Sequence, residues 1–290
     1  MKALSFGEIL WDVYPNEKFI GGAPLNFAAH FSKCGGKAYM ISAVGKDNLA
    51  NETIECVEKM NVSTKYISRS DRETGKCLVT LNEKMIPTYD LLSDVAYDYI
   101  DTSAITGKSF DLLYFGSLAL RSEYNMKNLE KLLSNNSFAE IVVDINIRPP
   151  YYSDDVIKYA LTKASIIKIS DEELNVVEKA SIGKGGQDYK TVARELSKLY
   201  KNLKMVLITR GEKGSYLYRF EGKEYMCSAT PAKLASTVGA GDSFTAAFVI
   251  NYIKGESINK CLEYASKVSS FVVSHMDAVP DYEIDDLITY

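Results

Sequence analysis

The chain has 290 residues, of which 46% are hydrophobic and 25% are charged, and its formal net charge at pH 7 is −4. This composition is ordinary for a soluble globular chain long enough to bury one large core, and the mild negative charge, without a basic run, argues against nucleic acid as a partner. Because no apolar stretch reaches the length of a membrane span, and Glu8 and Asp12 interrupt the N-terminus before a signal-peptide core could form, we expect a cytoplasmic protein with no membrane partner.

The first part of the chain alternates between predicted strands and helices. We expect strands over 3–6 and 9–13, a helix from Pro24 to Gly35, a strand over 38–44 and a helix over 49–60. Pro24 suits a first helical position and Gly35 suits a C-terminal cap. Residues 66–96 differ, because apolar and polar residues alternate over 76–81, a polar turn follows at 82–84, and apolar residues resume at Ile86. That pattern predicts a β-hairpin.

The second part of the chain alternates more regularly. We expect strands over 112–115, 141–144, 166–169 and 205–209, an antiparallel pair over 215–219 and 225–228, and helices over 124–133, 154–161, from about 171, over 191–199, 241–254 and 257–274. Short apolar strands separated by amphipathic helices predict a doubly wound α/β fold, a mostly parallel sheet flanked by helices on both faces. No linker interrupts the pattern, so we expect one domain over residues 1–290.

Cysteine and histidine usage argues against a metal site made from these residues. The five cysteines are scattered and never spaced as C-x-x-C, which predicts reduced thiols. The two histidines, His30 and His275, lie far apart in the sequence and outside any H-E-x-x-H motif. We expect both to be ordinary packing or surface residues.

A glycine-rich turn precedes the helix predicted at 241–254. Gly239, Ala240 and Gly241 would let the backbone approach a ligand, and Asp242 follows them directly. The start of a helix offers free N–H groups and the positive end of the helix dipole, which suit an anion. A phosphate there, beside a carboxylate that accepts a proton from a hydroxyl, would form a phosphoryl-transfer centre. The local residues fit equally well a plain turn in which Asp242 only caps the helix.

Small polar residues gather after the first strand. Asp12, Gly22 and Asn26, together with Gly21, supply the short side chains and close backbone approach that a polyol substrate needs. The Gly-Gly pair before a helix is also ordinary turn chemistry. Both interpretations stay open on these residues alone.

Polar residues also follow three later predicted strands. Arg148 ends the segment DINIR and could pair with a phosphate, or face solvent. Glu173 lies where first-turn carboxylates are common, so a metal role is the less favoured interpretation. Thr209, Gly211 and Gly214 follow the strand MVLIT and could line a nucleotide pocket, or form a tight turn. There is no G-x-x-x-x-G-K-[ST] sequence, so a P-loop is excluded.

Taken together, these motifs resemble the ribokinase-like sugar kinases, also called the phosphofructokinase B family. An N-terminal signature over 21–47 and a C-terminal signature over 236–248 occur in the expected order. The segments GEILWDVYP, DINIRP and KISDEEL look most like the fructokinase branch. The resemblance implies a doubly wound α/β domain with a small β-sheet lid, formed by residues near 13–20 and 66–96.

The resemblance also implies roles for the candidate residues. Asp242 would be the general base, and the N–H groups of Gly239, Ala240 and Gly241 would stabilise the transferring phosphoryl group. Arg148 would hold the substrate or that group. The sugar hydroxyls would be bound by residues near the first strand, namely Asp12, Gly22 and Asn26.

The implied cofactors are ATP and Mg²⁺. Glu173 would organise Mg²⁺ through water. The residues bordering ATP would be Thr209, Gly211 and Gly214, with further contacts from Ser170 and Ser266, where the family commonly has Asn. Ser236 stands where the family motif usually begins with Asp, and Asp277 replaces a common Gly, so K⁺ is an open alternative rather than an expected cofactor.

The sequence therefore predicts an ATP-dependent kinase that phosphorylates a primary hydroxyl of a small sugar, with fructose first. The alternatives are a kinase for ribose, a 2-keto-3-deoxy sugar acid or a nucleoside, and a non-catalytic sugar- or nucleotide-binding protein of the same fold. Cys77, Val79 and Leu81 place apolar side chains on alternate positions of the hairpin. An exposed apolar ribbon would gain from being covered, which predicts a homodimer through the lids.

Overall fold

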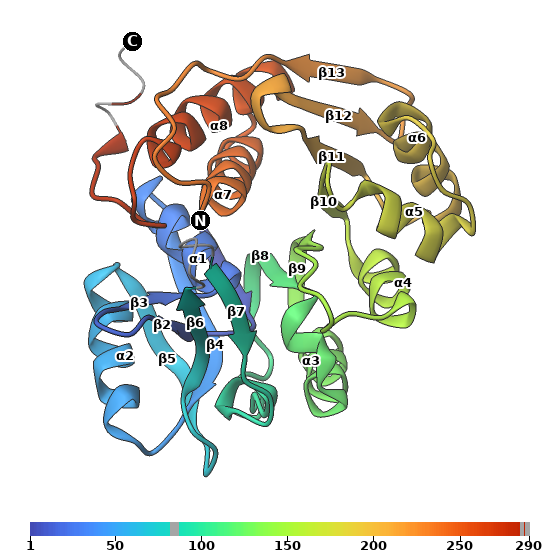
Figure 1. The fold of residues 1–290 in the computed structure, drawn as a ribbon. Coiled ribbons are helices and arrows are strands. Elements are labelled where there is room, and N and C mark those ends of the chain that lie inside the picture. Colours follow the sequence, from blue (N-terminus) through green and yellow to red (C-terminus); the bar gives the residue numbers. More distant parts are fainter. Residues whose placement is uncertain (82–86, 285–286, 288–290) are drawn as a thin grey trace.

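The computed structural model describes residues 1–81, 87–284 and 287, and is built on a nine-stranded sheet (Figure 1). The strand order is β13-β12-β11-β10-β9-β8-β1-β4-β5. The strands are β1 (Lys2–Phe6), β4 (Lys37–Val44), β5 (Val62–Arg69), β8 (Ser109–Gly116), β9 (Ser137–Asp144), β10 (Ile166–Ser170), β11 (Met205–Thr209), β12 (Ser215–Arg219) and β13 (Glu224–Cys227). From β11 to β5 every pair is parallel, and β12 and β13 add antiparallel pairs at one edge.

Helices cover both faces of this sheet (Figure 1). One face carries α1 (Ala23–Lys33), α2 (Asn48–Lys59), α7 (Ala240–Ile253) and α8 (Ile258–Val273); the other carries α3 (Glu123–Asn135), α4 (Asp154–Lys163), α5 (Leu174–Ile182) and α6 (Tyr189–Leu199). Their buried apolar side chains form two clusters, one on each face, so the predicted doubly wound fold is confirmed. Short 3₁₀ helices are η1 (Ala96–Asp98), η2 (Leu118–Arg121) and η3 (Gly211–Lys213). Among the residues described, no helix combines the length and apolar character needed to span a bilayer.

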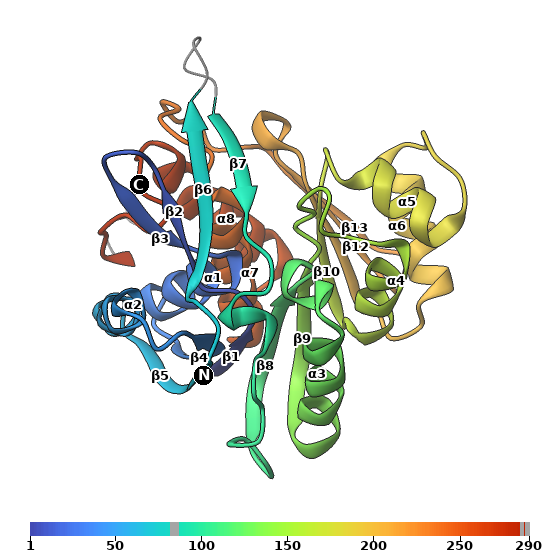
Figure 2. The same ribbon diagram turned by 60° about the horizontal axis from the view of Figure 1, so that its bottom comes forward.

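A smaller sheet of four strands stands apart from the main one. Its strands are β2 (Leu10–Val13), β3 (Lys18–Gly21), β6 (Gly75–Leu81) and β7 (Pro87–Leu91), in the order β3-β2-β6-β7. Figure 2 shows β6 and β7 projecting beyond the main sheet as a long ribbon. A third apolar cluster, which includes Leu10, Cys77, Tyr97 and Leu118, joins this sheet to the main body.

The predicted hairpin is shorter than expected. Residues 66–69 belong to β5, which pairs with β4 in the main sheet, because Tyr66 and Ile67 pack against the two large cores. The polar turn predicted at 82–84 lies outside the described residues. Cys77 and Val79 are both 2% exposed, so these two members of the predicted apolar ribbon are covered by the chain itself.

The strand order places a switch point beside β1. The chain continues from β1 to β4 and β5 on one side, and from β8 to β11 on the other. In open parallel sheets, ligands bind at the carboxyl ends of the strands at such a point. The candidate site therefore should lie where β1, β8 and β9 end.

Candidate active site

The glycine-rich turn forms the start of α7, as predicted. Gly239 is the N-cap residue with φ of 79°, and a Cβ atom there would lie 2.3 Å from the carbonyl oxygen of Ala278, so only glycine fits. The Ala240 N–H donates to Thr237 O at 3.3 Å, a long hydrogen bond. Within the described chain, the N–H groups of Gly239 and Gly241 have no assigned acceptor. The 14-residue helix α7 thus presents free donors at its positive end.

Asp242 lies in the first turn of α7 and is only 9% exposed. Its Oδ2 accepts a hydrogen bond from Nδ2 of Asn26 at 2.9 Å, which joins α7 to the first turn of α1. Burial raises the pKa of Asp242, while the Asn26 hydrogen bond and the charges of Lys168 and Arg148 oppose that rise. Two predicted site residues that are far apart in the sequence are therefore in direct contact.

A buried ion pair that the sequence analysis missed lies beneath this turn. Nζ of Lys168 is 3.1 Å from Oδ1 of Asp144, and their side chains are 8% and 1% exposed. The two residues are directly paired in register between β10 and β9. A Cβ atom on Gly241 would lie 3.0 Å from the Lys168 ammonium, so this glycine lets α7 begin directly over a positive charge.

Burial and neighbouring charges together set the protonation of this pair. Burial lowers the pKa of Lys168, but the charges of Asp144 and Glu173 outweigh it and raise that pKa above its ordinary value. Burial also raises the pKa of Asp144, and the charges of Glu173 and Asp242 add to the rise while Lys168 opposes it. Lys168 therefore remains an ammonium ion in a group of carboxylates.

Glu8 is a second acid that the sequence analysis did not assign to the site. It follows β1, is 2% exposed, and its Oε2 has no hydrogen-bond partner in the described parts of the chain. Burial raises the pKa of Glu8 to about 7, and the charge of Asp242 adds to the rise while that of Arg148 opposes it. Glu8 is thus a buried acid close to the predicted base.

The predicted substrate residues surround these acids. Gly22 is the N-cap residue of α1, and its carbonyl accepts the Asn26 N–H at 2.9 Å. Asp12 lies half-buried on β2, and burial raises its pKa. Arg148 is exposed, and its positive charge opposes the rise in pKa at each of the three acids Glu8, Asp12 and Asp242.

Glu173 ties together two strand-end loops. Its Oε1 accepts the Ile147 N–H at 2.6 Å and its Oε2 accepts the Ser170 N–H at 2.8 Å. In the part of the chain that the structure describes, no three Asp, Glu, His or Cys side chains are grouped to hold a metal ion. A Mg²⁺ ion here would therefore need ligands from water and phosphate, which Mg²⁺ ordinarily retains.

The predicted nucleotide residues lie at the ends of β10 and β11, in the turn that follows β11, and on α8. Ser170 and Thr209 are directly paired at the carboxyl ends of β10 and β11, and Gly211 begins η3 just beyond them. Gly214 packs closely against β13, because a Cβ atom there would lie 2.0 Å from the carbonyl oxygen of Cys227. Ser266 lies on α8.

The Ser266 hydroxyl is engaged within the protein. Its Oγ accepts the Thr230 N–H at 2.8 Å and lies 3.0 Å from Oγ1 of Thr230. The loop at Thr230 is thereby held to α8, and Ser266 shapes this region through that loop.

The chain has recognisable relatives over nearly its whole length. A family profile described as "pfkB family carbohydrate kinase" matches residues 5–285. The 5-dehydro-2-deoxygluconokinase of Clostridium beijerinckii is 28% identical over 273 residues, which cover 89% of this chain and 79% of that protein. The probable fructokinase-5 of Arabidopsis thaliana is 26% identical over 317 residues, which cover 96% of this chain and 93% of that protein.

The fold also matches solved structures. The crystal structure of aminoimidazole riboside kinase from Salmonella enterica, in complex with aminoimidazole riboside and an ATP analogue, aligns with a TM-score of 0.83 at 19% identity. The alignment covers 100% of this chain and 99% of that one. At this identity the likeness shows the shared fold, including a mostly parallel sheet and a smaller second sheet.

Proposed function

Because this chain belongs to the pfkB family of carbohydrate kinases, we propose that it transfers the terminal phosphoryl group of ATP to the primary hydroxyl of fructose, giving fructose 6-phosphate. One observation carries the proposal. The Asp242 carboxyl lies at the amino end of α7, beside free backbone N–H groups and against Asn26 of α1. A general base and an oxyanion site are therefore next to each other.

Asp242 acts as the base in this mechanism. It accepts the proton of the sugar hydroxyl as that oxygen forms a bond to the terminal phosphorus, and the bond from phosphorus to the leaving oxygen of ADP breaks. The charges of Lys168 and Arg148 favour the ionised carboxylate against the effect of burial. Asn26 fixes the carboxylate through Oδ2 and leaves Oδ1 for the hydroxyl.

The amino end of α7 stabilises the transferring group. The N–H groups of Gly239 and Gly241, with the weakly bonded N–H of Ala240, point donors at the developing negative charge. The Lys168 ammonium beneath Gly241 adds a buried positive charge, which is most effective where water is excluded. These groups are fixed before the reaction and need no reorganisation during it.

The sugar and the nucleotide approach from opposite sides of Asp242. Asp12, Gly22, Asn26 and Arg148 bind the sugar, with the smaller sheet as a lid that excludes water. The nucleotide is bordered by residues at the ends of β10 and β11 and on α8, namely Ser170, Thr209, Gly211, Gly214 and Ser266. K⁺ stays an alternative rather than an expected cofactor, because Ser236 and Asp277 depart from the family pattern.

The donor set fits Mg²⁺ bound through water and the nucleotide phosphates. Asp144, Glu173 and Asp242 all interact electrostatically with the Lys168 ammonium, and among the described residues they offer oxygens to a hydrated ion rather than a complete set of direct ligands. Glu173 would hold the ion through water while its oxygens bind the Ile147 and Ser170 N–H groups. When bound, Mg²⁺ supplies neutralisation of phosphate charge.

A 2-keto-3-deoxy sugar acid is the second candidate substrate. Arg148 is exposed and bonds only to a backbone carbonyl in the described structure, so its guanidinium is available to a substrate carboxylate. The relative from Clostridium beijerinckii is named 5-dehydro-2-deoxygluconokinase, a kinase for a different keto-deoxy sugar acid that also carries a carboxylate.

A coupled assay of ADP release across fructose, ribose, 2-keto-3-deoxygluconate and a nucleoside tests the proposal. We expect the highest kcat/KM with fructose. A higher value for the sugar acid would support the second candidate. Fructose binding by calorimetry with no ADP formed in Mg-ATP would instead show a binding protein.

A further inference from the structure

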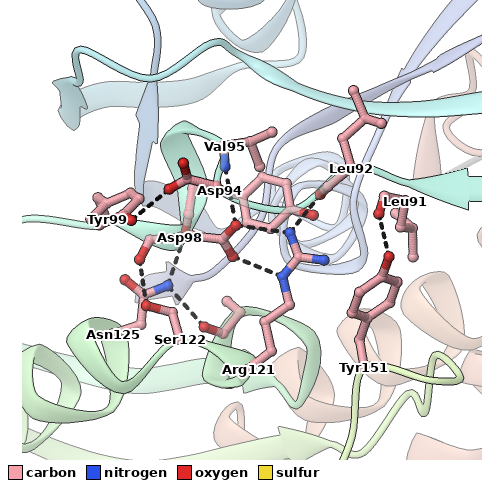
Figure 3. Close-up of polar contacts among 12 residues, drawn as sticks. Leu91, Leu92, Asp94, Val95, Asp98, Tyr99, Arg121, Ser122, Asn125 and Tyr151 are labelled. Carbon is pink, nitrogen blue, oxygen red and sulfur yellow. Dashed lines mark hydrogen bonds and ion pairs between the residues drawn. The ribbon is translucent and has the colours of Figure 1, made fainter.

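The carboxyl end of β7 is held by two side chains from the main body (Figure 3). The Tyr151 hydroxyl donates to the carbonyl oxygen of Leu91 at 2.6 Å, and Nη2 of Arg121 donates to that of Leu92 at 2.7 Å. Tyr151 follows β9, and Arg121 ends η2. We call these two contacts the latch, because they join the smaller sheet to the body where the chain leaves β7.

Arg121 is rigidly anchored. Its Nε and Nη2 donate to the two carboxylate oxygens of Asp98 at 2.8 and 2.9 Å, and the two side chains are 9% and 8% exposed. Its guanidinium lies 5.0 Å from the ring centre of Tyr97 and 4.7 Å from that of Tyr151. A bidentate, charge-assisted pair between two aromatic rings has little freedom to move, so the latch is a fixed support.

The latch lies at one end of a row of paired residues across the smaller sheet, and Asp12 lies in the same row. Leu91 of β7 pairs with Cys77 of β6, and Cys77 pairs with Asp12 of β2. Neighbouring strands lie about 4.8 Å apart, so two strand spacings, roughly 10 Å, separate Leu91 from Asp12. A shift of the Leu91 carbonyl would therefore be carried across the ladder to Asp12.

The latch is also tied to Arg148. Only Pro149 and Pro150 lie between Arg148 and Tyr151, and their ring-fixed φ angles make the connection stiff. The Tyr151 N–H donates to the carbonyl oxygen of Arg148 at 2.7 Å. The hydroxyl that holds the smaller sheet and the backbone that carries Arg148 are thus parts of one short turn.

From this arrangement we propose that Tyr151 and Arg121 are positioning residues that set the separation of Asp12 and Arg148, and thereby the affinity for the sugar. The inference rests on the proposed function, in which Asp12 and Arg148 bind the sugar from two sides. Neither latch residue touches the substrate in this account.

The test compares Tyr151→Phe with Tyr152→Phe. The first removes the hydrogen bond to Leu91; the second removes the same atom from a half-buried neighbour whose hydroxyl has no assigned hydrogen bond among the described residues. Arg121→Lys is a second variant, which keeps the charge but loses the bidentate geometry. Melting temperatures establish that each variant is folded.

The first readout does not need activity. Losing one hydrogen bond shifts a local opening equilibrium by about fivefold. We expect hydrogen exchange at residues 10–13 and 75–81 to be about fivefold faster in Tyr151→Phe and unchanged in Tyr152→Phe. Unchanged exchange in both variants would overturn the latch, whatever the enzyme's substrate.

The second readout compares the KM for the sugar with the KM for ATP in each variant. We expect Tyr151→Phe and Arg121→Lys to raise the KM for the sugar about fivefold and to leave the KM for ATP unchanged. A sugar KM within about twofold of the parent, or both KM values rising together, would overturn the positioning role. A parent that phosphorylates no sugar would refute the proposed function, and the exchange result would then decide the latch by itself.

Discussion

Replacing Lys168 by Met removes the positive member of a buried pair. The Nζ to Oδ1 distance is 3.1 Å, and the side chains of Lys168 and Asp144 are 8% and 1% exposed. Met has similar volume, so the change leaves Asp144 as an uncompensated charge rather than a large cavity. Breaking one side of a buried pair costs about 3–5 kcal/mol of unfolding free energy. That is a large fraction of the roughly 5–15 kcal/mol that stabilises a typical protein.

The cost should depend on pH. In the parent, burial already holds the pKa of Asp144 above its ordinary value, and loss of the Lys168 ammonium raises it further. The folded state then binds a proton more tightly than the unfolded state, so stability is kept at low pH and lost as pH rises through the folded pKa. Between the ordinary pKa of Asp144 and its raised folded pKa, the unfolding free energy falls by about 1.4 kcal/mol per pH unit. Lys168→Met should therefore be nearly normal at about pH 4.5 and most destabilised at about pH 8.

Urea unfolding at both pH values measures this effect. Lys163→Met is the matched control, because Lys163 is 29% exposed and pairs at 2.6 Å with Glu130, which is 48% exposed, and such a partly exposed pair contributes below about 1 kcal/mol. The double variant Lys168→Met/Asp144→Asn removes both charges and should recover part of the loss. A loss below about 1 kcal/mol for Lys168→Met at pH 8, or a double variant as unstable as the sum of the single variants, would refute the reasoning.

Three further predictions follow from the same geometry. In the parent, the unfolding free energy should fall by about 1.4 kcal/mol per pH unit between the ordinary Glu8 pKa of 4.5 and its folded pKa of about 7. Glu8→Gln should remove this fall, and an unchanged pH slope in urea unfolding would contradict the prediction. Arg148→Ala should raise the sugar KM by about tenfold or more with unfolding free energy within about 0.5 kcal/mol of the parent; a KM within about twofold would exclude Arg148 from sugar binding. Phe19 and Tyr89 of the smaller sheet are 45% and 56% exposed, which suits a dimer formed through that sheet. Light scattering at micromolar concentration should give a dimeric mass that Phe19→Ser reduces, and a monomeric parent would contradict a dimer through the smaller sheet.

The local pattern of apolar and polar residues was enough to predict most of the fold. The apolar runs of β10 and β11, bounded by polar residues, identified buried parallel strands. The edge strand β5 was missed because only Val62 and Tyr66 of its eight residues are buried, so it lacks the continuous apolar run of the central strands. Its place in the main sheet depends on Tyr66 and Ile67 packing against distant cores, and local pattern does not show that.

The candidate site was predictable only where a residue has a local motif. Asp242 and Gly239 lie in a recognisable turn, but the contact between Asn26 and Asp242 joins positions 216 residues apart. Lys168 stands alone in the apolar strand IIKIS, and its partner Asp144 becomes evident only from the register of β9 and β10. A lone charge inside a buried strand does signal a partner on the adjacent strand, because an unpaired buried charge is too costly.

The turnover of Asp242→Asn tests the central claim most directly. Asn keeps the shape of the side chain at the start of α7 but does not accept the hydroxyl proton. We predict that kcat, measured by coupled ADP release with the best sugar of the panel, falls by about 10²–10⁴-fold while calorimetry shows sugar binding largely kept. Near-normal turnover in this variant would contradict the assignment of Asp242 as the base.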